Sequence, residues 1–461
     1  MNTETLKNRR ILIAGLGLTG FSVIRFLVRH DLLFDVVVDC DEAQANAYRQ
    51  DIEPLITAKQ NPILHTELSM DVAARYDLVI ISPGIPRSHP AIVSALAAGI
   101  EVIGDIELFA SAATLPVIAV TGSNGKSTVV AWLAHTLQIA GIKALACGNI
   151  GQPALDSLLV EADLYVLELS SYQLESTYSL NAISATVLNI SADHLDRYES
   201  LDHYAQTKRR LHPMSDLVVV NRDDNRTWPT EGLSDEDSRN KYEYFTISLD
   251  SADHQNTRWH RLANGDVNYL CDGDCSLIDE AQLSMPGVHN VANALAVLAL
   301  VSPLKLEFER LRSGLISFAG LPHRSQLVAE SDGIRWYNDS KGTNVDACKK
   351  AILAMPGPVL LIAGGISKGA DFRPLNDVMR CHVKLVILIG RDRELMAEQL
   401  DDAIEIVMTA GLDEAVEIAS DRAEPGEVVL LSPACASFDM FRNFEDRGDQ
   451  FVAAVHEVLA A

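Results

Sequence analysis

The stretch Val117-Ile-Ala-Val-Thr-Gly-Ser-Asn-Gly-Lys-Ser-Thr128 decides the fold of the middle of the chain. Its apolar start predicts a buried strand, and the small-residue loop that follows opens an apolar helix over 126–140. Backbone N–H groups of such a loop, together with the helix dipole, bind phosphate oxygens. Lys126 would then reach the terminal phosphates, and Ser127 would ligate Mg²⁺. The order of strand, loop, lysine and hydroxyl favours this interpretation over a helix start with a chance lysine.

The loop departs from the most common phosphate-binding pattern in one respect. The spacing G-x-x-x-x-G-K-[ST] requires a first glycine where this chain has Val120. The chain carries the shorter form T-G-x-x-G-K-S instead.

A second glycine-rich turn lies near the start of the chain. The run Ile11-Leu-Ile-Ala-Gly-Leu-Gly-Leu-Thr-Gly20 is followed by Asp39 at the end of the next predicted strand, which fits the dinucleotide fingerprint. Tight packing of a strand on a helix and binding of a nucleotide-linked sugar diphosphate are the alternatives. The turn Ser82-Pro-Gly-Ile85 also ends a strand of this block, and simple turn chemistry would explain it equally well.

The middle block offers candidates for a metal site. Glu168 ends the apolar strand 164–169, and His194 follows the strand expected over 185–190. Neighbouring parallel strands end at one edge of a sheet, so both side chains would face the phosphate loop and could complete a Mg²⁺ site. Lys208 lies on a predicted helix beside Arg209 and Arg210, where a solvated lysine is the simplest interpretation.

Two lysine-bearing polar turns mark the last third of the chain. One spans 338–344 and contains Lys341, and the other spans 364–371 and contains Lys368. They suggest a surface that meets anionic groups, with ordinary loops as the competing interpretation.

Buried strands alternate with helices along the whole chain, which predicts parallel α/β sheets. We expect three domains: a Rossmann-like domain over 1–104, a phosphate-loop ATPase domain over 105–320 and a Rossmann-like domain over 321–461. The polar stretch 222–260 has little periodicity and is interpreted as a surface excursion of the middle domain. Strands are expected at 10–15, 35–39, 77–82, 116–121, 164–169, 185–190, 217–221, 358–363, 384–389 and 427–432.

Composition excludes several classes of protein. The 461 residues carry a formal net charge of −25, so a basic nucleic-acid-binding surface is not expected. The seven cysteines are scattered and include no C-x-x-C pair, which argues against zinc and suits a reduced cytoplasmic protein. The apolar run after Lys7 and Arg10 is broken by glycines and Arg25 and lacks a signal-peptide cleavage site. No segment reaches membrane-spanning length.

Taken together, the motifs resemble those of the Mur ligase family over nearly the whole chain. The shortened phosphate loop is the family's normal form, and the turn Asp339-Ser-Lys-Gly-Thr-Asn344 is highly specific for it. The other segments that carry the resemblance are Gly15–Gly20, Ser82–Ile85, Gly148–Gly151, Glu168–Glu175, Asp193–His194, His289–Asn290 with Asn293, Gly320–Arg324, Leu431–Asp439 and Phe444–Gly448.

The resemblance implies an ATP-dependent amide synthesis in peptidoglycan precursor formation. It is strongest to the members that add D-glutamate to UDP-N-acetylmuramoyl-L-alanine. ATP would phosphorylate the terminal carboxylate of that substrate, and the amine of D-glutamate would attack the acyl phosphate. The implied cofactors are ATP and two Mg²⁺ ions, and the implied partners are small molecules only. A cytoplasmic monomer is expected.

The resemblance also implies a role for individual residues. The catalytic group would comprise Lys126, Asn149, His194 and Lys208, the last of which the family carbamylates. Metal contacts would come from Ser127, Glu168, His194 and Lys208. ATP contacts would come from Gly122, Ser123, Asn124, Gly125, Lys126, Ser127, Thr128, Asn290, His323, Arg324, Asp339 and Lys341. The uridine diphosphate would lie near Gly17, Thr19, Asp39, Ser82 and Gly84. The D-glutamate pocket would contain His194, Lys341, Thr343, Lys368, Ser437 and Phe444.

Three rival functions remain open on the residues. A nicotinamide-dependent dehydrogenase would use Gly15–Gly20 and Asp39 but leaves the phosphate loop at 121–128 unexplained. A non-catalytic phosphate-loop switch would not need Glu168 and His194. A relative that adds another amino acid is the nearest alternative within the family.

Overall fold

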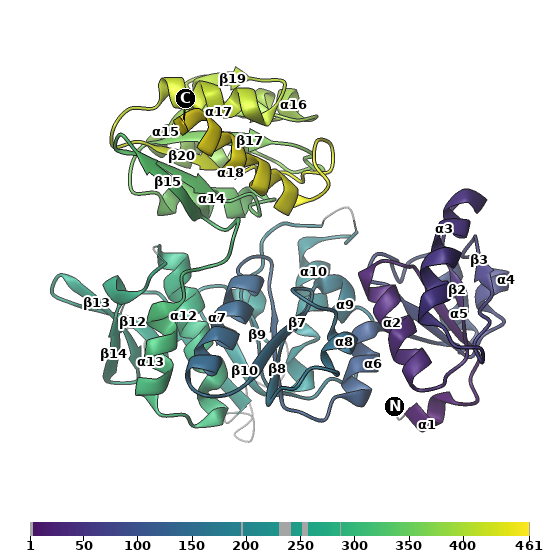
Figure 1. Cartoon of the computed structure of the whole chain (residues 1–461). Helices are drawn as coiled ribbons and strands as arrows, with labels where there is room; N and C mark the ends of the chain where they lie inside the picture. Colours follow the sequence, from purple (N-terminus) through teal and green to yellow (C-terminus); the bar gives the residue numbers. More distant parts are fainter. Residues whose placement is uncertain (1–2, 195–196, 230–240, 251–256, 286, 461) are drawn as a thin grey trace. The chain divides into compact units, whose positions relative to one another are not determined.

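The computed structural model describes residues 3–194, 197–229, 241–250, 257–285 and 287–460 (Figure 1). Contacts between Cα atoms divide the chain into two compact units. The first unit takes in Met1–Ile190, Asp202–Glu280 and Asn293–Ile316, and the second takes in Ser191–Leu201, Ala281–Ala292 and Ser317–Ala461. Two sheets belong to the first unit and one sheet to the second, and all are built largely from parallel strands.

The N-terminal sheet has the strand order β3-β2-β1-β4-β5 and is parallel throughout. The order reverses between β1 and β4, which is where ligands bind in sheets of this kind. Helix α2 begins within the glycine-rich motif, at Leu18. The elements are β1 (Ile11–Ala14), α2 (Leu18–Arg29), β2 (Phe34–Val37), α3 (Glu42–Ile52), β3 (Leu64–His65), α4 (Met70–Ala73), β4 (Leu78–Ile81), α5 (Pro90–Ala97), β5 (Glu101–Gly104) and α6 (Asp105–Ala112), preceded by α1 (Thr3–Leu6).

The central sheet runs β14-β13-β12-β11-β10-β9-β6-β8-β7. The strands from β12 to β7 in this order pair in parallel, and β6 lies within this parallel part. Strands β12, β13 and β14 pair antiparallel. The strands are β6 (Val117–Thr121), β7 (Ala144–Gly148), β8 (Leu164–Glu168), β9 (Ala182–Val187), β10 (Ser215–Asn221), β11 (Tyr242–Thr246), β12 (Trp259–Asn264), β13 (Val267–Asp272) and β14 (Cys275–Asp279).

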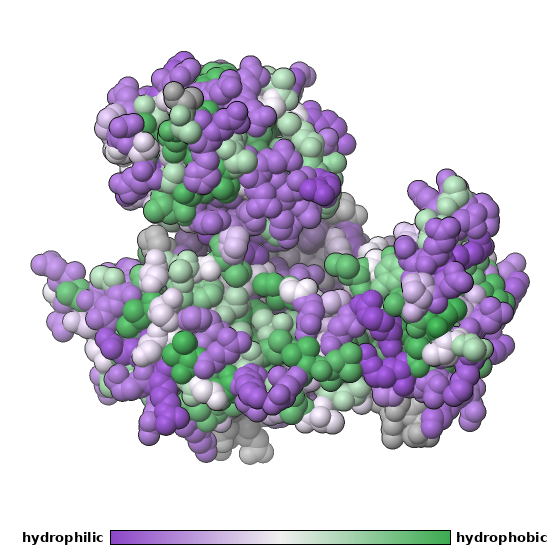
Figure 2. Space-filling model, viewed as in Figure 1, coloured by the Kyte–Doolittle hydropathy of each residue, from purple (hydrophilic) through white to green (hydrophobic). Residues whose placement is uncertain are grey.

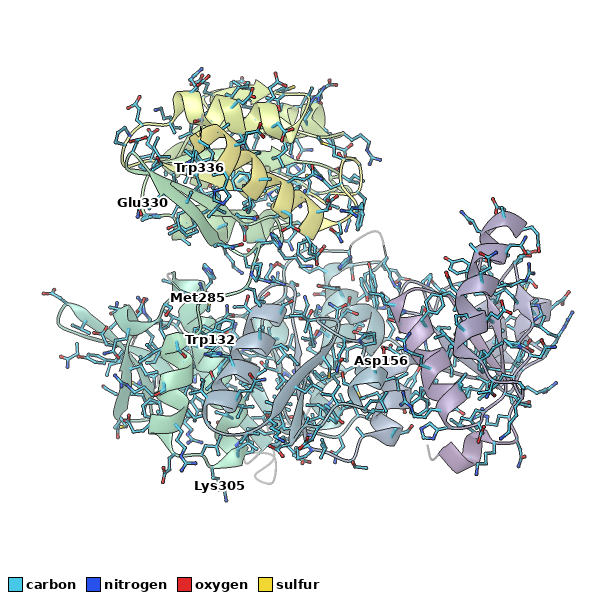
Figure 3. The ribbon with its side chains drawn as sticks, in the orientation of Figure 1. Trp132, Asp156, Met285, Lys305, Glu330 and Trp336 are labelled. Atoms are coloured by element: carbon cyan, nitrogen blue, oxygen red, sulfur yellow. The ribbon has the colours of Figure 1, made fainter. Side chains whose placement is uncertain are left out.

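Helices of the central sheet region connect these strands. Trp132 of α7 is fully buried and donates its indole N–H to the carbonyl oxygen of Leu315 at 3.1 Å, which fixes α7 against α13 (Figure 3). The helices are α7 (Lys126–Ile139), α8 (Ala154–Ser157), α9 (Ser171–Leu174), α10 (Leu201–Arg209), the short 3₁₀ turn η2 (His212–Met214), α12 (Val288–Val301) and α13 (Phe308–Ser317).

The expectation that 222–260 is a surface excursion is partly wrong. Tyr242–Thr246 forms β11 inside the central sheet, and Phe245 is 1 % exposed because it packs in the core of that sheet. Trp259 begins β12 and pairs with Phe245. Phe245 and Trp259 are the buried apolar residues of these short strands. The many polar residues around them obscure this pattern in the sequence. Residues 230–240 and 251–256 lie outside the described residues.

The C-terminal sheet has the order β15-β16-β20-β17-β18-β19 and is parallel except at the β15–β16 hairpin. Helices α14 and α15 cover one hydrophobic core, and α17 and α18 cover another that contains Trp336 and Phe451 (Figures 1 and 3). The elements are β15 (Gln326–Ser331), β16 (Ile334–Asn338), α14 (Val345–Ala354), β17 (Val359–Gly364), α15 (Asn376–His382), β18 (Val383–Ile389), α16 (Arg393–Gln399), β19 (Ile406–Met408), α17 (Leu412–Arg422), β20 (Val428–Leu431) and α18 (Phe444–Ala460).

The surface agrees with the acidic composition. Hydrophilic residues cover most of the face seen in Figure 2, with apolar residues scattered between them. Among the described helices, none is both long enough and apolar enough to span a bilayer.

Candidate functional site

The loop after β6 has the geometry of a phosphate-binding turn. Gly125 caps α7 in the left-handed conformation (φ +82°), and Gly122 also has a positive φ of 153°. The positive φ of Gly125 disfavours any residue with a side chain, and a Cβ there would also come within 2.9 Å of the Asn293 side-chain oxygen. Ser127 and Thr128 follow as nearly buried first-turn residues of the helix. The predicted strand, loop and helix are therefore confirmed.

Lys126 lies over this loop. Its ammonium donates to the carbonyl oxygens of Gly122 and Ser123 at 2.8 and 3.0 Å. The cation is thus held above the same turn whose N–H groups would meet an anion. A phosphate group bound there would offer stronger, charge-assisted partners than two neutral carbonyls.

Asn189 shapes the loop, and the sequence interpretation gave it no role. Its side-chain oxygen accepts from the Asn124 N–H at 2.9 Å, and its amide donates to the Asn124 carbonyl at 3.0 Å. Its backbone carbonyl also accepts from the Ser123 N–H at 2.9 Å. Asn189, which lies just beyond the end of the neighbouring strand β9, therefore holds the backbone of the phosphate loop in place. Asn189 is a polar residue within the apolar run expected as a strand at 185–190, and this departure from the run was the signal that could have found it.

Glu168 ends β8, next to β6, as predicted. The Asn149 amide donates to Glu168 Oε1 at 2.7 Å, and the Asn149 backbone N–H donates to the Glu168 carbonyl at 3.0 Å. Glu168 is 1 % exposed, and no described residue donates to its buried Oε2. Gly148 permits this clasp because a Cβ there would lie 2.4 Å from the Glu168 carbonyl oxygen.

Lys208 is not the solvated lysine that its surroundings in the sequence suggested. Its side chain is 1 % exposed, and its ammonium lies 4.7 Å from the centre of the Tyr204 ring. The ammonium donates to Thr121 Oγ1 at 3.4 Å. Because Cβ atoms on a helix point toward its N-terminus, a lysine near the end of α10 reaches back to the end of β6. Lys208 therefore joins the phosphate loop.

These residues suit a hard cation. A buried carboxylate oxygen without a donor and the hydroxyl of Ser127 at the first turn of α7 are oxygen ligands of the kind that Mg²⁺ takes. Among the described residues, no three His, Cys, Asp or Glu side chains converge on one point. A cation here would accordingly need oxygens from a bound phosphate as well.

His194 and Asn290 belong to the second unit, whereas Ser127, Glu168 and Lys208 belong to the first. His194 has a left-handed backbone (φ +56°), and its N–H donates to Asp193 Oδ1 at 2.9 Å. Asp193 Oδ2 in turn accepts from the Asn344 amide at 3.3 Å. The contribution of His194 and Asn290 to the metal and ATP contacts remains a prediction.

The two turns of the N-terminal sheet lie side by side. Ser82 Oγ donates to the Gly15 carbonyl at 3.0 Å, and the Ser82 N–H donates to the Ala14 carbonyl at 2.9 Å. Gly15 has φ +90°, and a Cβ at Gly20 would lie 2.2 Å from the Gly15 oxygen. A Cβ at Gly17, in contrast, would have no atom within 4 Å. Gly15 and Gly20 thus serve the packing of strand on helix, whereas packing does not require glycine at position 17, and its predicted contact with the uridine diphosphate stays a prediction.

The remaining N-terminal candidates differ in their surroundings. Thr19 is half-buried in the first turn of α2, and Gly84 follows Ser82 in the second turn. Asp39 lies two residues beyond the end of β2, and its Oδ1 accepts from the Leu68 N–H at 2.7 Å. That bond gives Asp39 a structural role in addition to the predicted ligand contact.

In the second unit, Asp339 organises the turn after β16. It is 8 % exposed, and it accepts from Ser432 Oγ at 2.7 Å and from the Ser325 N–H at 3.0 Å. Burial raises the pKa of this carboxyl to about 6 despite those hydrogen bonds. Gly342 must be glycine, since a Cβ would lie 2.4 Å from Asp339 Oδ2.

Lys341 and Phe444 form a cation–π pair. The ammonium lies 3.7 Å from the ring centre, which brings together two of the six residues predicted for the D-glutamate pocket. Thr343 follows in the same turn, and its N–H donates to the Lys341 carbonyl at 2.8 Å.

Arg447 supports this turn and was not singled out on its own in the sequence. Its fully buried guanidinium donates to Ser340 Oγ at 2.9 Å, to the Ser340 carbonyl at 2.7 Å and to the Cys435 carbonyl at 3.2 Å. One side chain therefore ties the turn after β16 to the turn after β20.

The turn after β17 lies against the turn after β20. Ile366 and Ala436 exchange backbone hydrogen bonds at 2.9 Å in both directions. Lys368 is exposed with φ +51°, and Ser437 is 2 % exposed. The loops that carry the two residues are thus joined.

His323 and Arg324 lie before β15. His323 Nδ1 is 3.0 Å from the Asn338 amide, and a Cβ at Gly448 would come within 2.2 Å of that nitrogen. His323 is therefore packed against the start of α18 rather than open to solvent. Arg324 is half-buried and close enough to Asp339 to act on its pKa.

Comparison with known sequences agrees with this arrangement. The Mur ligase MurD-like N-terminal domain matches residues 9–104, the Mur ligase middle domain matches 120–301, and the Mur ligase glutamate ligase domain matches 323–435. A UDP-N-acetylmuramoylalanine–D-glutamate ligase from Pseudomonas fluorescens is 42 % identical over 451 residues, which cover 97 % of this chain and 98 % of that protein.

Solved structures share the fold at low sequence identity. A pseudomurein peptide ligase type C from Methanothermus fervidus is 17 % identical with a TM-score of 0.61, over 98 % of this chain and 100 % of that one. The MurF ligase of Thermotoga maritima, solved in complex with ADP, is 14 % identical with a TM-score of 0.58, over 100 % and 97 %. With three domain matches in order and 42 % identity to a member over nearly its whole length, the chain belongs to the Mur ligase family.

Proposed function

We propose that the chain is an ATP-dependent ligase that joins D-glutamate to UDP-N-acetylmuramoyl-L-alanine in the synthesis of peptidoglycan precursors. The observation that carries the proposal is the meeting of the phosphate loop, Glu168 and Lys208 at the carboxyl ends of β6 and β8. The choice of D-glutamate rests on the 42 % identity to a ligase of that specificity.

The reaction proceeds in two steps. The alanyl carboxylate takes the γ-phosphoryl group of ATP, so that one P–O bond forms, another breaks, and ADP is released. The amine of D-glutamate then attacks the carbonyl carbon of the acyl phosphate, loses a proton and expels inorganic phosphate. The net products are the amide, ADP and phosphate.

The phosphate loop of the first unit would hold and orient the phosphates. The loop N–H groups and Lys126 bind the phosphoryl oxygens, and Asn189 keeps the loop in shape for them. Ser127, Glu168, His194 and a carbamylated Lys208 would hold two Mg²⁺ ions, with Asn149 fixing the Glu168 carboxylate. Metal ions held there would supply positive charge to the phosphoryl group in transfer. Asn290, His323, Arg324 and Asp339 complete the predicted ATP contacts.

The turns of the second unit would bind the amino acid. Lys341, Lys368, Thr343 and Ser437 offer cations and hydroxyls suited to the two carboxylates of D-glutamate, and Phe444 fixes the Lys341 ammonium. His194 is assigned to the same pocket. This gives 321–461 the amino-acid-binding role, 105–320 the ATP-binding role and 1–104 the role of binding the uridine diphosphate through Gly17, Thr19, Asp39, Ser82 and Gly84.

Location and assembly complete the proposal. The seven cysteines are all free thiols, which suits the reducing cytoplasm. We place the enzyme there, as a monomer, in a pathway on which cell-wall growth, cell shape and division depend.

The test is a phosphate-release assay with ATP, Mg²⁺, UDP-N-acetylmuramoyl-L-alanine and one amino acid at a time. We expect release with D-glutamate, loss of it with L-glutamate, and no release when the UDP-linked substrate is omitted. Faster release with another amino acid would assign the chain to a different member of the family. Hydride transfer to NAD⁺ with no phosphate release would replace the ligase by the dehydrogenase alternative.

A further inference from the structure

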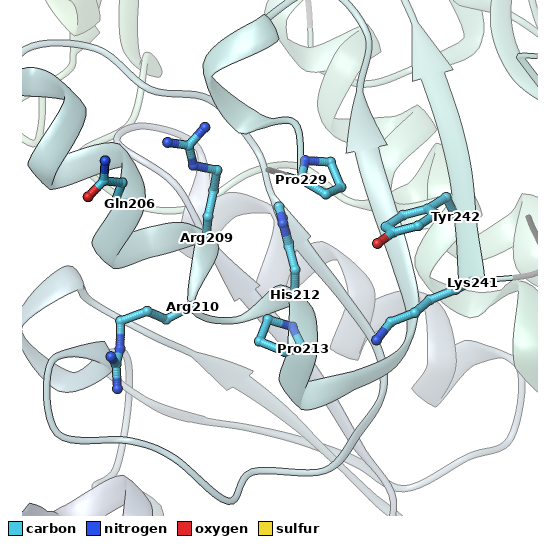
Figure 4. A pocket seen from close by; sticks show the side chains of 8 residues that line it. All are labelled: Gln206, Arg209, Arg210, His212, Pro213, Pro229, Lys241 and Tyr242. Carbon is cyan, nitrogen blue, oxygen red and sulfur yellow. The ribbon is translucent and has the colours of Figure 1, made fainter. Parts of the chain in front are cut away.

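A pocket of about 340 Å³ opens at the end of α10, away from the phosphate loop (Figure 4). Its walls come from the last turn of α10, the turn η2 and the start of β11. Strands β6 and β8 run parallel with β9, β10 and β11, and the phosphate loop lies at their carboxyl ends. The pocket lies at the opposite, amino-terminal edge, where β10 and β11 begin. It is therefore separate from the site described above.

The pocket is strongly cationic in a strongly acidic chain. Arg209, Arg210 and Lys241 all line it, and none of the described lining residues carries a carboxylate. Within the described part of the chain, neither Arg209 nor Lys241 pairs with an acid. Arg210 donates to the carbonyl oxygens of Leu174 and Thr177 at 2.9 and 3.0 Å. The charge of Glu175 acts on Arg210, so Arg209 and Lys241 are the two cations of the pocket that no acid among the described residues accompanies. A cluster of cations of this kind attracts anions even in a chain whose formal net charge is −25.

Two buried groups in the pocket lack hydrogen-bond partners. His212 is 5 % exposed, and neither ring nitrogen meets a described partner. The Arg209 Nε–H is likewise buried, and the Arg209 Nη1 reaches only the Trp228 carbonyl at 3.5 Å. Leaving such groups unsatisfied is costly, and native structures contain few of them. Burial, assisted by Arg209 and Lys241, lowers the pKa of His212 to about 4, so its ring is neutral at pH 7 and can donate or accept.

We propose that this pocket binds a small multivalent oxyanion, with phosphate or carboxylate groups, through Arg209, Lys241 and His212. A guanidinium suits planar, bidentate contact with either kind of oxyanion, and the ammonium adds a second positive charge on the other side of His212 (Figure 4). The volume lies at the lower end of the range for small-molecule sites, which favours an anion of few atoms. Pro213 and Tyr242 give the remaining wall an apolar character.

Pyrophosphate and citrate are the probes, and the full-length chain is the protein. Histidine-selective NMR would follow the His212 resonance, assigned by its loss in His212→Gln, during titration with each probe at physiological salt. We expect a saturable shift of His212, and the tighter of the two probes identifies phosphate or carboxylate as the preferred chemistry. Lys241→Gln should weaken the binding roughly tenfold, as expected for loss of one charge-assisted contact.

Matched variants separate this pocket from other anion sites. Lys126→Ala, which disables the phosphate loop, should leave the His212 shift unchanged. Arg310→Gln removes an exposed cation of the same unit, which pairs with the exposed Glu307, and should also leave the His212 shift unchanged. Arg209→Gln should abolish binding, and if that variant fails to fold, Lys241→Gln on the partly exposed side decides the matter. The proposal would be overturned if neither probe shifted the His212 resonance. It would also be overturned if Lys241→Gln bound the probes as tightly as the unaltered protein.

Discussion

Asn149 and Glu168 are joined side chain to side chain, with the amide of Asn149 donating to Glu168 Oε1 at 2.7 Å. One carboxylate oxygen is thereby used, and the other, Oε2, is buried with no donor among the described residues. An ionised carboxylate in such surroundings requires a positive partner. The Asn149 hydrogen bond holds the Glu168 carboxylate at the end of β8, so a cation bound to Oε2 would lie beside the phosphate loop at the end of β6.

The first prediction concerns Glu168→Gln. The change keeps the shape but removes the negative charge, so the site should hold Mg²⁺ poorly. We expect turnover to fall about 100-fold, which corresponds to ~2.7 kcal/mol of transition-state stabilisation. The measurement is phosphate release as a function of Mg²⁺ concentration. Glu161→Gln is the control, because Glu161 is exposed and pairs with the exposed Lys143. Unchanged turnover and Mg²⁺ dependence in Glu168→Gln would remove Glu168 from the metal site.

The second prediction concerns Lys126→Ala. The ammonium that now contacts the Gly122 and Ser123 carbonyls would no longer neutralise charge on the transferring phosphoryl group. We expect a loss of roughly 3 kcal/mol in transition-state stabilisation, or about two orders of magnitude in kcat/KM. Lys143→Ala, at an exposed ion pair, should be neutral. Near-normal turnover in Lys126→Ala would contradict the assignment of the phosphate loop.

The sequence predicted ten of the strands that the described residues form, and it missed others such as β5, β7 and β16. All ten expected strands exist, because each is a short apolar run buried on both faces of a parallel sheet. The strand expected at 185–190 is found at Ala182–Val187, displaced because Ser184 and Thr186 are buried polar residues. The Ser184 hydroxyl donates to the Leu300 carbonyl, and the Thr186 hydroxyl donates to the Val219 carbonyl. These partners are distant in the chain, so no local sequence pattern reveals that the two buried hydroxyls are hydrogen-bonded.

What sequence reasoning missed depends on tertiary contacts. Lys208 looked solvated beside two arginines, and its burial arises from the position of α10 over β6. Asn189 and Arg447 act on loops that are distant in the chain, Arg447 on Ser340 more than 100 residues away. The strands of 242–279 are short and half polar, so their pairing, rather than their hydrophobicity, defines them.

The third prediction uses the buried carboxyl of Asp339, whose pKa is raised to about 6. The folded state therefore binds this proton more tightly than the unfolded state. The resulting stabilisation is fully present below about pH 4 and is lost as the pH rises through about 6. Asp339→Asn mimics the protonated form, so its stability relative to wild type should increase between pH 4 and 7, by about 2 kcal/mol.

Urea unfolding at several pH values measures this difference. It can be followed through Trp336, the only tryptophan beyond residue 259 in the sequence. Asp105, whose pKa burial also raises to about 6, is present in both proteins and cancels in the comparison. A stability difference that does not change between pH 4 and 7 would show that Asp339 keeps an ordinary pKa.

The fourth prediction concerns Lys368. Its ammonium is exposed on the turn after β17 and is assigned to a carboxylate of the incoming amino acid. Lys368→Ala should raise the KM for D-glutamate at least tenfold while the KM for ATP changes little. Lys368→Asn should behave alike, since asparagine tolerates the left-handed backbone at φ +51° and excludes strain as the cause. Arg373→Gln, an exposed cation nearby in the sequence, is the control. An effect confined to the KM for ATP would move Lys368 to the nucleotide site.

The fifth prediction is that the amine of Lys208 reacts with CO₂ to form a carbamate. Nitrogen attacks the carbon of CO₂, a C–N bond forms, and the amine releases one proton. The reaction needs an uncharged amine, which buried lysines supply more readily than solvated ones. Lys208 is 1 % exposed and reaches the end of β6 beside the strand that ends in Glu168. Its carbamate would add an anionic oxygen ligand for a second Mg²⁺.

Substitutions of Lys208 distinguish a carbamate from a role of the lysine's positive charge or of its packing. Lys208→Arg keeps the positive charge but cannot form the same stable carbamate, so it should lose activity as completely as Lys208→Ala. Formate or acetate, added at high concentration, should partly restore Lys208→Ala by supplying the missing carboxylate, and should do nothing for Lys208→Arg, whose guanidinium fills the space. Lys305→Ala, at a lysine of the first unit far along the chain from the phosphate loop, is the control for nonspecific effects of the anions. An active Lys208→Arg enzyme, or an intact-protein mass spectrum and ¹³CO₂-labelled NMR spectrum with no carbamate signal, would contradict the modification. Rescue by a small carboxylate in the alanine variant alone would tie the function of Lys208 to an anion rather than to its ammonium.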